Sequence, residues 1–170
     1  LDERQFRQEY CASFEDFTGR IFYAYSEANI KSYAGPAPRE LHIGMDFNVV
    51  PGMTATVGVR DGDALFIIDE IVIANGNTDE MVAEIQNRYS GSKINVYPDP
   101  AARQRKTSAA GRTDLTILQN AGFTVHCPAA HRPVKDDINA VNSRLCSGQN
   151  QLRRLWIDAR CKYTIQGLER

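Results

Sequence analysis

Four aspartates stand where a strand is expected to end or a helix to begin, and together they suggest a metal site. Asp46 lies in the alternating run Leu41–Val49, Asp99 follows a short apolar run, and Asp136 and Asp137 follow a proline. Carboxylates are the hard oxygen donors that Mg²⁺ and Mn²⁺ take in proteins. Two such ions about 4 Å apart activate a water and stabilise the leaving oxygen in phosphodiester hydrolysis. The chemistry that these residues indicate is metal-dependent cleavage of a phosphodiester.

Each aspartate also has a plainer interpretation. Asp46 is equally consistent with a solvated residue at the end of a strand. Asp99 lies between two prolines, which is typical of a turn, and Asp136 is well placed to cap a helix. Asp69 and Glu70 could also reach a metal, but they are weaker candidates because a strand in that position points one of them to solvent.

The strand expected at Leu41–Val49 would fix the position of Asp46. Its apolar residues Leu41, Ile43 and Met45 alternate with polar or small ones. This period of two predicts a strand with one face in the core. His42 shares the face of Asp46, and we expect a packed histidine there rather than a metal ligand.

The rest of the chain predicts a mixed α/β fold. After the first strand, the spacing of apolar residues and the turn residues between them predict strands at 53–60, 64–74, 93–97, 123–127 and 155–158. The same signals predict helices beginning near 78, 114, 134 and 159. Three strands in a row followed by alternating helices and strands favour a mixed sheet with helices on both faces. This order resembles the ribonuclease H-like arrangement. In such a sheet the first strand and the strand at 93–97 are neighbours, so Asp46 and Asp99 should meet at one edge.

Composition indicates an ordinary globular protein. Of the 170 residues 42% are hydrophobic and 24% are charged, and no apolar run approaches membrane-spanning length. The cysteines include no Cys-x-x-Cys pair, so a zinc site is not indicated and reduced thiols of a cytosolic protein are expected. The net charge of −1 excludes a uniformly basic surface but not a local basic patch.

The first forty residues differ from the remainder. They are rich in aromatic residues and end at Gly35–Pro38, which is typical of a linker. The chain lacks an initiator methionine, so we expect a fragment of a longer polypeptide. We therefore divide it into an N-terminal arm, 1–40, and a single domain, 41–170.

Several segments resemble the C-terminal nuclease domain of the large terminase subunit of tailed bacteriophages. The resemblance covers nearly the whole chain and rests on the segments Gly44–Phe47, Val96–Ala101, Pro133–Asn142, Arg154–Asp158 with Cys161, and the arm Phe6–Phe22. It departs from the family pattern at Pro100, where serine is commoner.

The resemblance implies a function and its parts. It implies Asp46, Asp99 and Asp136 as ligands of two Mg²⁺ or Mn²⁺ ions, with Asp137 as the competitor for the third place. It also implies cleavage of double-stranded concatemeric viral DNA during genome packaging, in the cytoplasm of the host cell. The implied partners are an ATPase domain of the same polypeptide, a portal protein and a small terminase subunit. No phosphate-cradling Gly-x-x-x-x-Gly-Lys-Ser/Thr motif occurs in this chain, so ATP chemistry would belong elsewhere.

A basic loop directly after Asp99 is the candidate DNA-binding segment. It carries Arg103, Arg105, Lys106 and Arg112. Beside a metal site these side chains would contact phosphates without reading sequence. The alternative is a solvated loop. A second basic group, Arg153, Arg154, Arg160 and Lys162, is expected to be a solvated face.

Two other functions remain open from the residues. Another ribonuclease H-like nuclease, such as a resolvase or a transposase core, would share the carboxylates. A non-catalytic portal-docking module would use them only as caps, and metal would then not stabilise it.

Charge reversal at Arg103, Arg105 and Lys106 tests the basic loop. Each phosphate contact releases counterions, so the triple variant should bind duplex DNA more weakly and with a shallower dependence of log Kd on log salt. Titration of labelled duplex at several salt concentrations measures the slope. An unaltered slope would identify the loop as a solvated excursion.

Overall fold

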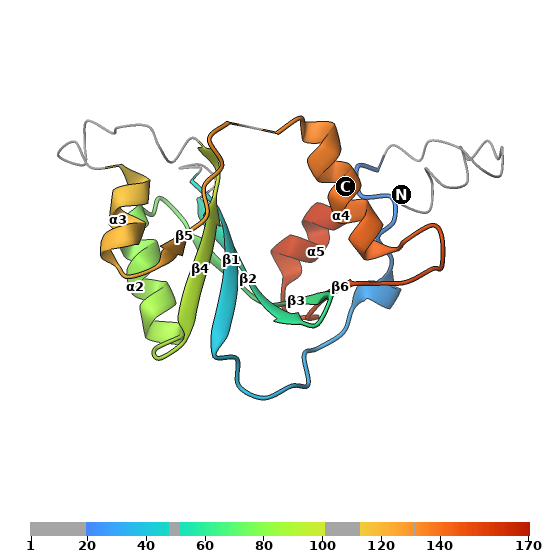
Figure 1. Cartoon of the computed structure of the whole chain (residues 1–170), viewed down its shortest axis with the longest axis horizontal. Coiled ribbons are helices and arrows are strands. Elements are labelled where there is room, and N and C mark those ends of the chain that lie inside the picture. The colour runs from blue at the N-terminus through green and yellow to red at the C-terminus, as the bar shows by residue number, and fades with distance from the viewer. Residues whose placement is uncertain (1–19, 48–51, 101–112, 131) are drawn as a thin grey trace. The chain divides into compact units, whose positions relative to one another are not determined.

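The computed structural model describes residues 20–47, 52–100, 113–130 and 132–170 (Figure 1). The strands are β1 (Glu40–Asp46), β2 (Met53–Asp61), β3 (Ala64–Ile73), β4 (Lys93–Pro98), β5 (Thr124–Val125) and β6 (Leu155–Ile157). The helices are a short 3-10 helix η1 (Glu27–Asn29) and the α-helices α2 (Thr78–Arg88), α3 (Asp114–Asn120), α4 (Val134–Leu145) and α5 (Lys162–Leu168). Element types and order agree with those expected from the sequence.

The six strands form one mixed sheet in the order β5-β4-β1-β2-β3-β6. β1 is antiparallel to β2 and parallel to β4, while β3 is parallel to β6. The expected pairing of the first strand with the strand at 93–97 is thus confirmed. Contacts divide the chain into two compact units. Unit 1 takes its described residues from 1–34, 60–68 and 132–170, and unit 2 from 35–59 and 69–131.

The core of unit 2 follows from the alternation along β1. Leu41, Ile43 and Met45 are buried, and the parallel register places Ile94 and Val96 of β4 on the same face. β1 ends at Asp46, before the expected Val49, and residues 48–51 lie outside the described part. The apolar face is therefore the one that the sequence predicts.

The two helices of unit 2 begin at polar caps. The side chain of Asn77 accepts from the Glu80 backbone N–H at 3.0 Å, and Glu80 accepts from the Asn77 backbone N–H at 2.9 Å, which is the predicted capping box. The hydroxyl of Thr78 donates to the buried carboxylate of Asp114 at 2.5 Å, joining the starts of α2 and α3. Figure 1 shows these helices beside β4 and β5.

Unit 1 has its own apolar core, and the end of the aromatic N-terminal arm belongs to it. Its buried residues are Ala24, Tyr25, Leu145, Cys146, Leu155, Ile157, Cys161 and Leu168. Ile30 forms a parallel bridge to Ile157. Residues 20–34 of the arm thus pack within unit 1. Residues 1–19 lie outside the described part, and a link to another domain stays a prediction.

A buried asparagine holds the segments of unit 1 together. Asn29, fully buried, donates to the carbonyls of Leu145 at 2.8 Å and Leu155 at 3.0 Å. Its carbonyl oxygen accepts from the Ser26 backbone at 3.1 Å and from Arg153 at 2.9 Å. One amide thus bonds to backbone groups at the start of η1, the end of α4 and β6, and the Leu145 carbonyl also accepts from Arg153 at 3.2 Å.

Three further boundaries differ from the sequence-based expectation. β5 is an edge strand of only two residues rather than five. α5 begins at Lys162 rather than at 159, because the side chain of Asp158 accepts from the Arg160 backbone at 3.1 Å and forms a turn first. The N-cap of α4 is Pro133, so Asp136 is not the cap. Proline suits a helix start because it has no N–H to leave unpaired. Within the described residues, no helix is both long and apolar enough to cross a membrane.

Replacing Asn29 by alanine should lower the free energy of unfolding by about 1–3 kcal/mol, because the Leu155 carbonyl loses the amide donor and the Leu145 carbonyl keeps only Arg153. Denaturant unfolding measures the loss. Asn87→Ala, at an exposed position of α2, is the matched control and should change stability little. A loss at Asn29 no larger than at Asn87 would contradict the role assigned to this amide.

Candidate active site

Asp46 and Asp99 follow equivalent positions on two parallel strands. The register pairs Met45 with Pro98; Asp46 is the next and last residue of β1, and Asp99 is the first residue after β4. Neighbouring strands are about 4.8 Å apart, which is within the span of a shared cation site. Asp46 is exposed and Asp99 is half-buried. The structure thus brings together two of the predicted ligands at the expected edge, on side chains that solvent reaches.

The two aspartates stand at the end of a polar face of the sheet. Period two puts His42 and Gly44 on the same side of β1 as Asp46, opposite the buried apolar residues. The antiparallel register adds Thr54 beside Asp46 and Thr56 beside Gly44. Because the core occupies the other face, this face carries polar groups at little cost to packing.

The other two predicted acidic residues lie in unit 1. Asp136 and Asp137 stand in the first turn of α4, and both are exposed. Consecutive helical residues point about 100° apart, so only one of them can face a given point directly. Among the described residues, no three acidic, histidine or cysteine side chains form a complete metal site. The third ligand stays a prediction.

The two basic groups singled out in the sequence differ in what the structure shows of them. Arg103, Arg105, Lys106 and Arg112 lie outside the described residues. The second group is expected to be a solvated face, and this holds for Arg160 and Lys162, which are exposed, but not for Arg153 and Arg154, which are half-buried. The three arginines are engaged within unit 1: Arg153 with Asn29 at 2.9 Å, Arg154 with Asp63 at 2.6 Å, and Arg160 with the Ile68 carbonyl at 2.9 Å. Sequence spacing missed this because the partners are distant in the chain.

Asp69, a weaker candidate ligand, is engaged in a structural cluster. Its carboxylate accepts from the Tyr89 hydroxyl at 2.6 Å and pairs with Arg88 at 3.0 Å. Partial burial alone would raise the pKa of this carboxyl. The hydrogen bonds from Tyr89, Arg88 and the backbone N–H of Glu70 outweigh burial and hold the pKa below its ordinary value. Asp69 therefore anchors β3 to the end of α2.

Sequence reasoning missed how three residues of the polar face come together. Tyr97 of β4 packs its ring against His126, with centroids 4.8 Å apart, and its hydroxyl lies 2.9 Å from Nδ1 of His42. A usable signal was present, because Tyr97 precedes Asp99 by two residues and so shares its side of the chain. His42 is half-buried, and the Tyr97 hydroxyl is one of its partners.

Asp69→Asn should reduce stability at neutral pH by about 1.5–3 kcal/mol, the usual range for hydrogen bonds to a charged group. Because the folded pKa lies below the unfolded value of 3.8, this contribution is present above about pH 4 and is lost as pH falls through the folded pKa. The difference between the native protein and the variant should therefore shrink in acid. Denaturant unfolding at several pH values measures it, with Tyr89→Phe, which keeps the charge, as the intermediate control. A difference independent of pH would contradict this assignment.

Comparisons with known proteins find the same fold in solved terminase structures. No family model and no curated protein matches the chain. The P22 large terminase nuclease domain matches 89% of this chain over 78% of its own length, with 17% identity and a TM-score of 0.64. The large terminase from a thermophilic bacteriophage, solved in complex with ATP-γ-S, matches 86% of this chain with 14% identity and a TM-score of 0.65.

This chain spans only 36% of the length of the thermophilic phage protein in that structure. A second crystal structure of the same protein matches with 12% identity and a TM-score of 0.63, and this chain spans 35% of its length. At identities this low, the similarity shows a shared fold and does not show the activity or the partners of this chain. The α/β, ribonuclease H-like prediction is thereby confirmed. The chain has the fold of the nuclease domain of phage large terminases.

Proposed function

We propose that the chain is a metal-dependent endonuclease that cuts double-stranded DNA by hydrolysing phosphodiester bonds. The observation that carries this proposal is the register of β1 with β4, which aligns Asp46 with Asp99 at the end of the polar face. The fold adds support, because the P22 large terminase nuclease domain has the same fold.

The donor set fits two Mg²⁺ or Mn²⁺ ions. Asp46 and Asp99 offer hard carboxylate oxygens, and Asp136 or Asp137 would supply the third ligand. When bound, such ions lower the pKa of a water and stabilise the charge on the leaving oxygen. These carboxylates would hold the ions at the end of the sheet, where Asp46 is exposed and Asp99 is half-buried.

The negative charges of Asp46 and Asp99 give a reason why the proposed reaction would need cations at this edge of the sheet. Two aligned carboxylates repel one another and repel an approaching phosphodiester. Cations at this edge would offset both repulsions. The basic loop after Asp99 would hold phosphates to either side of the cut through Arg103, Arg105, Lys106 and Arg112. Affinity would then depend on salt and little on base sequence.

The biological setting follows from the terminase fold as part of the same proposal. The substrate would be concatemeric viral DNA, cut during genome packaging in the cytoplasm of the host. The partners would be an ATPase domain in the same polypeptide, a portal protein and a small terminase subunit. The alternatives are a resolvase or transposase nuclease and a non-catalytic portal-docking module.

Asp46→Asn is the test of the nuclease. The native chain should convert supercoiled plasmid with Mn²⁺ or Mg²⁺ but not with EDTA. The variant should lose at least about 100-fold in rate, since even the outer partners of metal ligands cost 10- to 100-fold. Mn²⁺ should also raise the Tm of the native chain and not that of the variant. Asp61→Asn, an exposed strand-end carboxylate on β2, is the matched control and should cut normally.

The same assay on Asp136→Asn and Asp137→Asn identifies the third ligand, which is the position whose loss abolishes cutting. Full activity in the Asp46→Asn variant would contradict the assignment of Asp46 to the metal site. A chain that neither cuts DNA nor gains Tm with metal would favour the docking module.

A further inference from the structure

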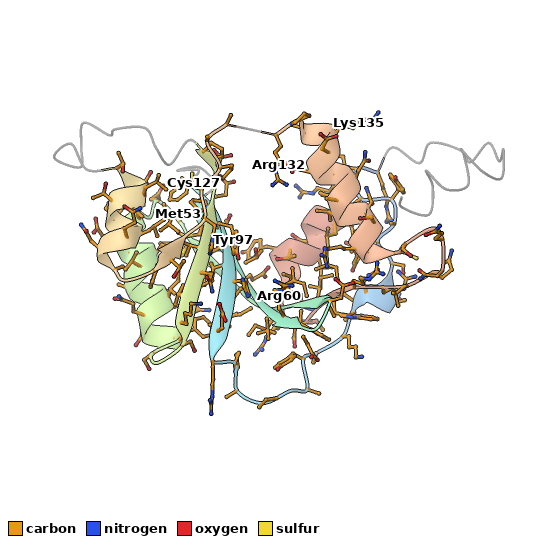
Figure 2. All side chains as sticks on the ribbon, viewed as in Figure 1. Met53, Arg60, Tyr97, Cys127, Arg132 and Lys135 are labelled. Atoms are coloured by element: carbon orange, nitrogen blue, oxygen red, sulfur yellow. The ribbon has the colours of Figure 1, made fainter. Side chains whose placement is uncertain are left out.

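Three aromatic rings lie in a row across the polar face of unit 2. The rings of Tyr97 and His126 are stacked, with centroids 4.8 Å apart and planes 13° apart. The His42 ring lies 5.9 Å from Tyr97 on its β1 side, tilted by 32°. These separations are close to the distance between neighbouring strands, so each ring stands on its own strand or strand extension. Figure 2 marks Tyr97 on β4.

A buried asparagine fixes the orientation of this row. The amide nitrogen of Asn95 donates to Glu40 at 2.7 Å and to the Leu41 carbonyl at 3.3 Å. Because both partners are acceptors, the amide oxygen must face Nε2 of His126, which lies 3.1 Å away. His126 therefore carries a proton on Nε2 and donates it. The His126 ring, which stacks on Tyr97, is thus held by a hydrogen bond to Asn95, a residue that is only 4% exposed.

The row remains accessible although it is ordered. Tyr97 is 42% exposed, and His126 is exposed as well. His126 covers one face of the tyrosine ring, and the neighbour on β1 in the register is Gly44, which has no side chain to cover the rest. The core of unit 2 lies on the opposite face of the strands, so packing does not demand these rings. An anchored, exposed phenol is an arrangement suited to contacting a ligand.

The hydroxyl of Tyr97 is the group that can donate outward. It lies 2.9 Å from Nδ1 of His42. When His42 carries its proton on Nδ1, the imidazole donates to the phenol oxygen and leaves the phenol proton for another acceptor. Phosphate and sugar oxygens are acceptors, and tyrosine hydroxyls are among the groups that contact them in protein–DNA complexes.

The position of the row relates it to the aspartates. Tyr97 precedes Asp99 by two residues, and Asp99 directly follows the end of β4; two residues of extended chain span about 6.6 Å. Two base-pair steps of duplex DNA cover about the same length along the helix axis. A strand whose phosphate lies at the aspartates would therefore pass the row within about two nucleotides.

We propose that the row formed by His42, Tyr97 and His126 is a contact surface for the DNA strand next to the cut, with the Tyr97 hydroxyl bonded to a phosphate or sugar oxygen. This inference rests on the proposed function. Tyr97 acts as a positioning residue, since it binds a part of the strand that does not react. His42 and His126 hold the phenol in place.

Tyr97→Phe tests the proposal most directly, because it removes the hydroxyl and keeps the ring. The Kd for a labelled duplex of about 30 base pairs, measured by fluorescence anisotropy in EDTA, should rise roughly 3- to 10-fold, which corresponds to one lost hydrogen bond. Tyr97→Ala should weaken binding at least as much. In cleavage assays KM should rise while kcat stays near the native value, as for a contact made equally in the ground and transition states.

Tyr163→Ala is the matched control, because Tyr163 on α5 is 66% exposed and belongs to unit 1. Equal Tm values for the native chain and Tyr97→Phe would show that the fold is intact. An unchanged Kd and KM in both Tyr97 variants would overturn the proposal, as would a fall in kcat with KM constant.

The outcome separates this proposal from the nuclease itself. If the native chain binds DNA but does not cut it, the nuclease fails and the Kd of Tyr97→Phe still decides the contact surface. If the native chain cuts DNA and the Tyr97 variants behave as native, only the contact surface fails. A native chain that binds no DNA overturns both.

Discussion

The parallel pairing of β1 with β4 is the constraint on which the site depends. Its register sets Met45 beside Pro98 and thereby gives Asp46 and Asp99 equivalent positions. A slip of one residue would move every side chain of β1 to the other face and place Asp46 against the core. The buried residues Leu41 and Ile43 prevent such a slip, because exposing them would cost several kcal/mol of apolar burial. The apolar face therefore specifies the chemistry of the polar face.

Polar side chains that reach across the chain complete what apolar packing leaves undefined. Asn29 joins three segments of unit 1 through four hydrogen bonds, and Asn95 orders the polar face of unit 2. A directed amide accepts only one arrangement of its neighbours, whereas apolar contact tolerates several. Asp69 has a comparable role between β3 and the end of α2. Each unit thus has a polar anchor beside its apolar core.

Periodicity was enough to predict the strands and the capped start of α2, because these depend on neighbours in sequence. The pairing that aligns Asp46 with Asp99 joins distant segments, and it was predicted from the ribonuclease H-like order of the elements. Sequence patterns failed where the structure of a segment is set by contacts with residues that a local pattern does not show. The engagement of Arg153 with Asn29 joins residues 124 positions apart, and no local pattern indicates it. The start of α5 was misplaced because the side chain of Asp158 closes a turn first. The third acidic ligand also depends on tertiary placement, so Asp136 and Asp137 cannot be separated by spacing.

A neutral phenol beside the aspartates is consistent with a site that must hold both cations and DNA. An arginine or lysine at position 97 would lie two residues from Asp99 and would compete with a metal ion for its carboxylate. A phenol has no charge to pair with that carboxylate at neutral pH, yet it still donates a hydrogen bond to a phosphate oxygen. Formal positive charge would then be useful further from the metal, as in the basic loop that begins at Arg103. On this argument neutral donors belong next to the ligands and cationic side chains belong outside them.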